Sequence, residues 1–274
     1  MSGATNRLAD TFARVQADHR IGLFPYLMAG FPDRASCGRL LDVIASSGAD
    51  GIELGIPFSD PLADGVTIQR ASARALEEGV TVADALDLVA DLRQRHDTPV
   101  VLMSYVNPLM AYGLDRLVAD AAAAGVDGFI VPDLPLEEAE AFQAICAPKG
   151  LHYIYFVAPT SDDERLRAVG ERATGFVYCV TLLGTTGARR ELSPELAPFL
   201  ARVRATVKAP MVAGFGIATP DHVSALVGQV DGAIVASALS DAIDHADPSE
   251  VDAVVARFVA ELRSATGGAA AAAR

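Results

Sequence analysis

The chain has 274 residues, of which 51% are hydrophobic and 21% charged, a composition typical of a folded globular protein and not of a disordered one. Its formal net charge of −13 argues against a surface for nucleic acids or anionic membranes, because both partners require clusters of basic residues. The three cysteines form no metal-binding motif and suggest no disulfide framework, which favours a reducing, cytoplasmic setting.

Short apolar runs alternate with amphipathic stretches along the chain. After an expected helix over 6–18, eight runs have the character of buried strands: 22–29, 51–54, 99–103, 128–131, 152–156, 175–179, 211–213 and 233–235. Apolar residues three or four positions apart predict the intervening helices, over 34–47, 67–76, 82–95, 114–124, 137–147, 162–173, 195–207, 220–227 and 248–264, and a helix also begins within 236–243.

Strands that alternate with helices predict parallel strands joined by right-handed crossovers. Eight such units in roughly 250 residues predict a closed (β/α)8 barrel of the TIM type, with an open doubly wound sheet as the alternative. We expect the helix over 6–18 to cover the barrel floor. No linker-like composition interrupts the pattern, so residues 1–274 are expected to form one domain, with 268–274 as a frayed tail.

Reactive side chains are scarce at the carboxyl ends of the predicted strands, where such barrels place their active sites. None of the five histidines and neither of the two lysines lies there, so a histidine metal site and a Schiff-base lysine have no candidate. The candidates that remain are acids and tyrosines, namely Glu53, Asp60, Asp64, Tyr105, Asp133 and Tyr178.

The stretch ELGIPFSDPLADG, which begins at Glu53, holds three of these acids. A lone glutamate in a buried strand is costly unless function requires it, so Glu53 is the strongest candidate for acid–base catalysis. Asp60 precedes a proline and can equally begin a turn. For Asp64 the alternative is an N-cap or near-cap of the helix over 67–76.

Three loops after the sixth, seventh and eighth strands are rich in small residues: 182–194 (LLGTTGARRELSP), 213–220 (AGFGIATP) and 236–243 (ASALSDAI). Small residues let backbone N–H groups approach an anion, and a helix N-terminus favours negative charge. These loops predict a phosphate site that needs no lysine, with ordinary turns as the alternative. The loop over 181–192 is long enough to act as a lid.

Five motifs, PYLMAGFPD, ELGIPFSDPLADGVTIQRA, VPDLPLEE, LGTTGAR and AGFGI, occur in an order and at separations that resemble the α subunits of tryptophan synthase, over residues 8–264. The resemblance implies a (β/α)8 barrel that cleaves indole-3-glycerol phosphate to indole and glyceraldehyde 3-phosphate. This retro-aldol reaction belongs to the last steps of tryptophan biosynthesis.

The resemblance also implies roles for individual residues. Glu53 would protonate C3 of the indole and take the proton of the C3′ hydroxyl, Asp64 would accept the indole N–H, and Tyr178 would position Glu53. Substrate-binding positions implied in the same way are Phe24, Met103, Tyr105, Thr186, Gly187, Phe215, Gly216, Ala236 and Ser237. Four of these (Phe24, Met103, Tyr105 and Phe215) would line the indole slot, and Thr186 would order against Asp64 when the lid closes.

The implied partner is a β subunit that holds pyridoxal phosphate and receives indole through a tunnel, in an α2β2 assembly. This chain would then carry no cofactor and no metal. Residues expected at the interface are Asp60, Pro61, Asn107, Pro132 and Asp133.

The sequence departs from the family pattern at two positions. Ala236 stands where glycine usually precedes the serine, and Val66 replaces the usual proline after Asp-Gly. The first change could crowd the phosphate and the second could loosen the loop. Two other hypotheses stay open: another phosphate-binding barrel, such as an isomerase or aldolase, and a catalytically silent activating subunit.

Overall fold

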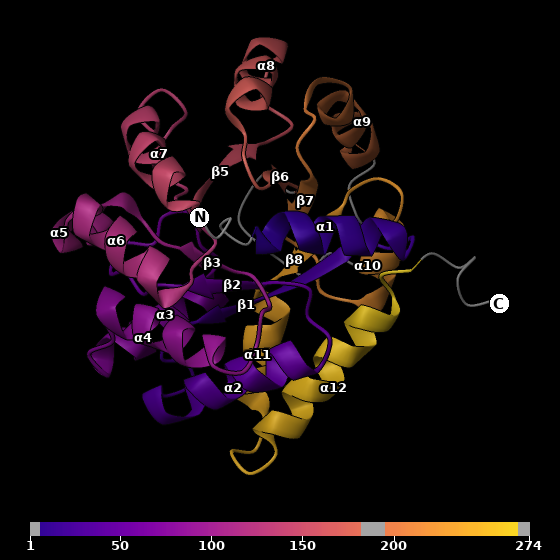
Figure 1. The fold of residues 1–274 in the computed structure, drawn as a ribbon. Coiled ribbons are helices and arrows are strands. Elements are labelled where there is room, and N and C mark those ends of the chain that lie inside the picture. The colour runs from indigo at the N-terminus through magenta and orange to yellow at the C-terminus, as the bar shows by residue number, and fades with distance from the viewer. Residues whose placement is uncertain (1–5, 182–194, 268–274) are drawn as a thin grey trace.

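Eight parallel strands close into a barrel at the centre of the molecule, and helices surround them (Figure 1). The computed structural model describes residues 6–181 and 195–267. Each strand pairs with its neighbours in chain order, and β8 closes the ring against β1. The predicted TIM barrel is therefore confirmed, with β1 (Gly22–Met28), β2 (Ile52–Gly55), β3 (Val100–Met103), β4 (Gly128–Ile130), β5 (His152–Val157), β6 (Val177–Val180), β7 (Met211–Gly214) and β8 (Gly232–Val235).

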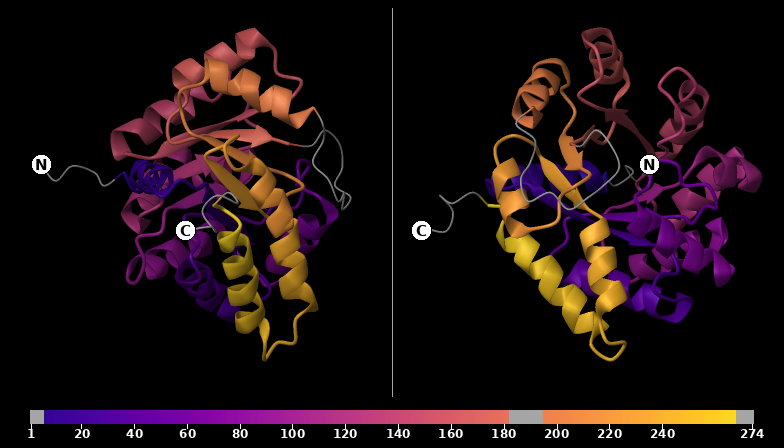
Figure 2. Two further views of the ribbon diagram at one scale, coloured as in Figure 1. Left: turned by 90° about the vertical axis from the view of Figure 1, so that its right-hand side faces the viewer. Right: turned by 180° about the vertical axis from the view of Figure 1, so that it is seen from behind.

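The helices lie around the barrel, as the two views of Figure 2 show. Their buried apolar residues form one core together with those of the strands. They are α1 (Arg7–Ala17), α2 (Arg34–Ser46), α3 (Val66–Glu77), α4 (Val82–Arg93), α5 (Val106–Tyr112), α6 (Leu114–Ala124), α7 (Glu140–Cys146), α8 (Asp163–Arg172), α9 (Leu196–Thr206), α10 (Pro220–Leu226), α11 (Ser237–His245) and α12 (Val251–Ser264), with a short 3₁₀ helix η1 (Ala147–Lys149). The expected tail over 268–274 lies outside the described residues.

The helix α5 was not predicted from the sequence. This helix has seven residues, too few to show a clear periodicity, and Pro108 in it argues for a loop. However, Pro108 is the third residue of the helix. Backbone N–H groups of the first turn have no partner within a helix, so the missing N–H of proline costs little there.

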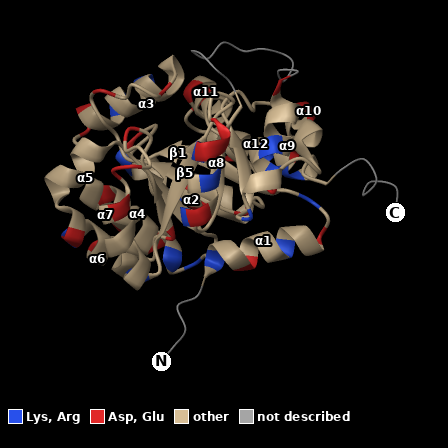
Figure 3. Cartoon of the chain, turned by 90° about the horizontal axis from the view of Figure 1, so that it is seen from above, with Lys and Arg blue, Asp and Glu red and all other residues tan. Residues whose placement is uncertain are grey.

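The N-terminal helix α1 covers the amino ends of the strands, as predicted, and lies below β1 and β5 in Figure 3. Arg7 of α1 forms a 2.9 Å ion pair with Asp127, which directly precedes β4. The ring of Phe12 stacks on Phe24 of β1 at 5.8 Å and meets Phe176 edge-on at 6.1 Å. These contacts form a floor of ion pairs around an aromatic centre.

Asp50 is the most connected acid of this floor. It accepts hydrogen bonds from Arg20 at 2.6 and 2.8 Å and from the backbone N–H of Leu23 at 3.0 Å. We expect Asp50→Ala to lower the free energy of unfolding by about 3–5 kcal/mol, because the buried Arg20 keeps only the half-exposed Asp18 as an ion-pair partner. Urea unfolding checks this. The control Asp163→Ala removes an exposed pair with Arg202 and should cost less than about 1 kcal/mol; equal losses in both variants would contradict the prediction.

Candidate active site

The side chain of Glu53 projects from β2 into the interior of the barrel. Glu53 is paired in register with Tyr26 of β1 and Val101 of β3. Because side chains alternate along a strand, it points the same way as Gly51 and Gly55, where neighbouring aromatic rings fill the space that a Cβ would take. Glu53 is only 4% exposed, and within the described part of the chain its Oε2 has no hydrogen-bond partner. The expected buried glutamate is confirmed.

Two tyrosine rings face the same space from different strands. A Cβ on Gly55 would lie 2.0 Å from the hydroxyl oxygen of Tyr26, and a Cβ on Gly214 would lie 2.1 Å from that of Tyr178. Each ring therefore lies over a glycine of the next strand. Burial raises the pKa of each hydroxyl well above the usual value for tyrosine, and the carboxylates of Glu53 and Asp64 raise it further. Both tyrosines thus share one buried chamber with the acids.

The loop between β2 and α3 brings Asp64 to this chamber. The backbone N–H of Ala63 donates a hydrogen bond to the hydroxyl of Tyr105 at 2.9 Å, and the Tyr105 ring lies 5.3 Å from that of Phe58. These contacts anchor the loop beside the third strand. The N-cap of α3 is Gly65, without a side-chain hydrogen bond. Asp64, which precedes it, is therefore not the N-cap of this helix.

Burial raises the pKa values of Glu53 and Asp64 to different extents. It raises the pKa of Glu53 to about 8, and the charge of Asp64 contributes to this shift. Burial also raises the pKa of Asp64, to about 6, although a hydrogen bond from Tyr105 opposes the change. At neutral pH the chamber consequently holds one protonated and one ionised carboxyl group, an arrangement suited to acid–base chemistry.

Four of the predicted phosphate-site residues lie just beyond the neighbouring strands β7 and β8: Phe215, Gly216, Ala236 and Ser237. Phe215 and Gly216 have left-handed backbones, with φ of +72° and +75°, a strained conformation for phenylalanine. Ser237 begins α11, whose N-terminus has no side-chain cap, so the N–H groups of Ser237 and Ala238 are available to an anion. Thr186 and Gly187 lie outside the described residues.

The structure places Phe24 and Met103 at different depths. The ring of Phe24 lies 5.8 Å from Phe12 and 5.9 Å from Phe176, so its described aromatic contacts are with the floor. Met103 ends β3 and pairs in register with Gly55. Of the two, Met103 is the one beside the chamber of the carboxyls.

Two aromatic residues of the chamber were not among the predicted site residues. One is Tyr26; the other is Phe156 of β5, whose ring lies 4.8 Å from that of Tyr178. Tyr26 follows Phe24 by two positions in the expected strand and therefore faces the same side. That spacing was the available signal. No comparable signal singled out Phe156.

The described ranges, 6–181 and 195–267, were compared with two further features, a metal site and a membrane-spanning helix. No group of three or more His, Cys, Asp or Glu residues there could hold a metal ion. Within the same ranges, every helix is too short or too polar to cross a membrane.

Comparison with known proteins gives one consistent answer. The sequence profile described as "Tryptophan synthase alpha chain" matches residues 12–267. The tryptophan synthase alpha chain of Roseiflexus castenholzii is 52% identical over 259 residues, which cover 94% of this chain and 99% of that protein. The alpha chain of Chloroflexus aggregans is 50% identical over 262 residues, which cover 95% of this chain and 98% of that protein.

Solved structures agree. The crystal structure of the tryptophan synthase alpha chain from Legionella pneumophila superposes with a TM-score of 0.88 at 36% identity, over 96% of this chain and 98% of that chain. A structure of Mycobacterium tuberculosis tryptophan synthase also gives a TM-score of 0.88 at 36% identity, with coverages of 96% and 99%. The chain therefore belongs to the tryptophan synthase alpha chain family, the lyases that cleave indole-3-glycerol phosphate in tryptophan biosynthesis.

Proposed function

We propose that Glu53 is the acid–base of the cleavage and that Asp64 accepts the indole N–H. The observation that supports these roles is the separation of their pKa values, about 8 and about 6, within one buried chamber. One group holds a proton that it can give, and the other carries a charge that can stabilise a cation. Tyr178 is proposed to position Glu53, because its hydroxyl is buried close enough to both carboxyls for their charges to raise its pKa.

The bond to be broken joins C3 of the indole to C3′ of the glycerol chain. Glu53 gives its proton to C3, which turns the ring into an indoleninium cation, and Asp64 stabilises that cation through the ring N–H. The Glu53 carboxylate then takes the proton of the C3′ hydroxyl while the C3–C3′ bond breaks. The bonding electron pair returns to the ring and C3′ becomes the aldehyde carbon. Glu53 thereby regains its proton.

The rest of the substrate is proposed to lie between the indole slot and the loops of β7 and β8. Met103, Tyr105 and Phe215 would line the slot, whereas Phe24 packs against Phe12 and Phe176 on the floor below it. The phosphate would bind the backbone around Gly216, Ala236 and Ser237, where the N-terminus of α11 favours an anion. Thr186 and Gly187 are proposed to close over the substrate.

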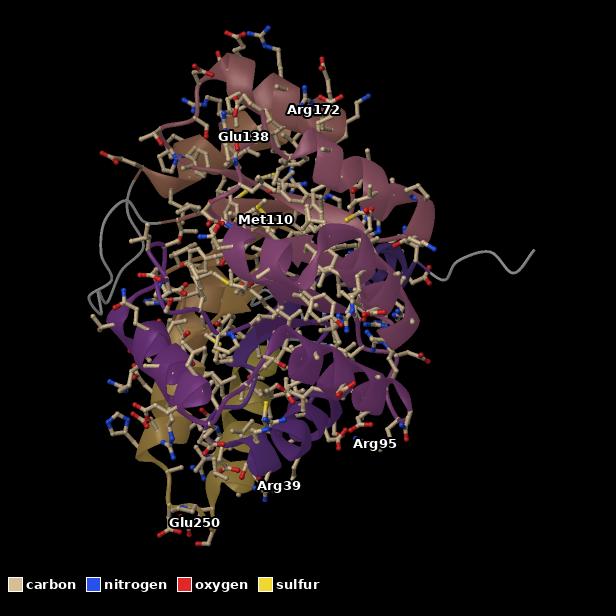
Figure 4. All side chains as sticks on the ribbon, turned by 90° about the vertical axis from the view of Figure 1, so that its left-hand side faces the viewer. Arg39, Arg95, Met110, Glu138, Arg172 and Glu250 are labelled. Carbon is tan, nitrogen blue, oxygen red and sulfur yellow. The ribbon has the colours of Figure 1, made fainter. Side chains whose placement is uncertain are left out.

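A β subunit is proposed to dock on the loops after β2, β3 and β4. Four of the expected interface residues lie on these loops, where Asp60 and Asp133 are exposed and Pro61 and Pro132 are partly buried. The fifth, Asn107, is exposed in the first turn of α5, just after β3. Three large apolar side chains nearby are also exposed, Leu62 at 92%, Val66 at 71% and Met110 at 60%, and Figure 4 shows Met110 on the outer face. Exposed apolar side chains gathered around such loops favour a protein partner.

The assembly is proposed to be α2β2, in the cytoplasm, with this chain contributing one domain over 1–274. The partner is proposed to hold the pyridoxal phosphate. Lys149 and Lys208 both precede strands, β5 and β7, so neither reaches the chamber at the carboxyl ends. A lysine is the residue that binds pyridoxal phosphate covalently, which is why the residues of this chamber do not fit that cofactor.

The pKa values predict a bell-shaped dependence of kcat/KM on pH. Activity should rise through about pH 6 as Asp64 ionises and fall through about pH 8 as Glu53 loses its proton. Indole release from indole-3-glycerol phosphate, measured between pH 5 and 9, checks this. A flat profile over that range would contradict the proposed protonation states.

Cleavage assays with and without a β subunit test the proposed function as a whole. We expect the chain to release indole and to leave simple sugar phosphates unchanged. Turnover of a simple sugar phosphate would favour another phosphate-binding barrel enzyme. Binding of the β subunit without cleavage in the complex would favour a silent activating subunit.

A further inference from the structure

The hydroxyl of Tyr26 has no role in the proposed chemistry, although it shares the chamber with Glu53. The two residues are register partners on β1 and β2, so their side chains enter the barrel next to each other. Both are almost fully buried, with exposures of 2% for Tyr26 and 4% for Glu53. Their polar atoms therefore depend on each other and on the protein for hydrogen bonds.

Neither group has a strong partner in the described structure. The hydroxyl of Tyr26 donates to Sδ of Met28 at 3.8 Å, and a thioether sulfur is a weak acceptor. Oε2 of Glu53 is buried without any hydrogen-bond partner among the described residues. A buried donor with a weak acceptor and a buried acceptor with no donor thus lie on adjacent strands.

Gly55 holds the space that the Tyr26 ring needs. A Cβ at this position would lie 2.0 Å from the hydroxyl oxygen and 2.6 Å from Cζ of Tyr26. Tyr178 occupies the equivalent place over Gly214, from another side of the barrel. A carboxylate has two oxygens, each able to accept hydrogen bonds, so two hydroxyls can serve one ionised Glu53.

We propose that Tyr26 is a positioning residue for the cleavage, whose hydroxyl turns from Met28 to Glu53 and donates a hydrogen bond to the carboxylate after Glu53 has given up its proton. The inference rests on the proposed acid–base role of Glu53. A hydrogen bond to the ionised form favours that form, which makes Glu53 a stronger acid toward C3 of the indole. The other titratable groups that face this chamber are Asp64 from the β2–α3 loop, Tyr105 from the end of β3 and Tyr178 from β6.

Tyr26→Phe tests the proposal, because it keeps the ring and removes only the hydroxyl. Without the donor, the pKa of Glu53 should rise, and the alkaline limb of the kcat/KM profile should move up by about one pH unit. We expect kcat to fall about ten-fold, with KM changed less than about two-fold because the ring remains. The control is Tyr153→Phe, which removes another buried hydroxyl, bonded to the Leu134 carbonyl at 2.9 Å, and should leave the limb in place.

A direct titration separates this proposal from the proposed function. The ¹³C resonance of the Glu53 carboxyl, identified by its loss in Glu53→Gln, reports its pKa without any turnover. If Glu53→Gln still cleaves substrate while Tyr26→Phe raises the Glu53 pKa, the acid–base role fails and the Tyr26 contact stands. An unchanged Glu53 pKa in Tyr26→Phe, or an equal rise in Tyr153→Phe, would overturn the contact.

Discussion

Glu53→Gln should lower the kcat of indole-3-glycerol phosphate cleavage by about 10³-fold or more, while the barrel stays folded. An amide cannot give a proton to C3 of the indole or take one from the C3′ hydroxyl, and such a group typically contributes about 10²–10⁴-fold. Steady-state indole release with saturating substrate measures the loss. The matched control is Glu250→Gln, an exposed glutamate before α12 that is labelled in Figure 4 and lies away from the proposed docking loops, which should keep normal activity. Near-normal cleavage by Glu53→Gln would remove Glu53 from the mechanism.

The same substitution should change how stability depends on pH. Glu53 has a pKa of about 8 in the folded chain against an ordinary value of 4.5. The unfolded chain therefore releases this proton first, and the folded state loses stability as pH rises from about 4.5 to about 8. The loss is on the order of 5 kcal/mol, since each pKa unit corresponds to about 1.4 kcal/mol. Glu53→Gln should lack this decrease, which urea unfolding at pH 5 and pH 9 would reveal.

Asp64→Asn should lower kcat/KM by about 10²–10³-fold, the loss typical when one group that stabilises transition-state charge is removed. Asparagine keeps the size of the side chain, but it has no negative charge to stabilise the indoleninium cation. The acid limb near pH 6 should also disappear, because the group that ionises there is gone. Steady-state kinetics between pH 5 and 9 measure both effects.

A suitable control for Asp64→Asn is Asp115→Asn in the first turn of α6. Asp115 is exposed, and it lies on the outer shell of helices. Its replacement should leave both limbs of the pH profile in place. If Asp64→Asn retained the acid limb, another group would have to account for the ionisation near pH 6.

The barrel was predictable because its signals are local. The eight apolar runs lie between amphipathic stretches, and each run became a strand, with ends that differ by a few residues at most. Glu53 stood out for a similar reason, since one acid in an apolar run is visible in the sequence alone. The helix α5 was not predictable in this way, because seven residues with a proline carry little periodicity.

The arrangement within the chamber depends on contacts between distant segments. Nothing in the residues around Glu53 indicates that a hydroxyl from β1 shares its chamber, or that burial and Asp64 raise its pKa to about 8. Phe24 illustrates the same limit. The strand pattern places Phe24 and Tyr26 on one face, but only the barrel as a whole shows that Phe24 contacts α1 and that the carboxylates raise the pKa of Tyr26.

The ion-paired floor has a consequence for protein engineering. Asp50 and Asp127 engage arginines at the amino ends of the strands, whereas the pKa of Glu53 depends on burial and on Asp64, with no described cation involved. Thermal robustness and chemistry thus reside at opposite ends of one scaffold. Substitutions that stabilise the floor at the amino ends of the strands leave the carboxyl groups of the chamber unchanged. Variants with a higher free energy of unfolding therefore need not have a lower kcat.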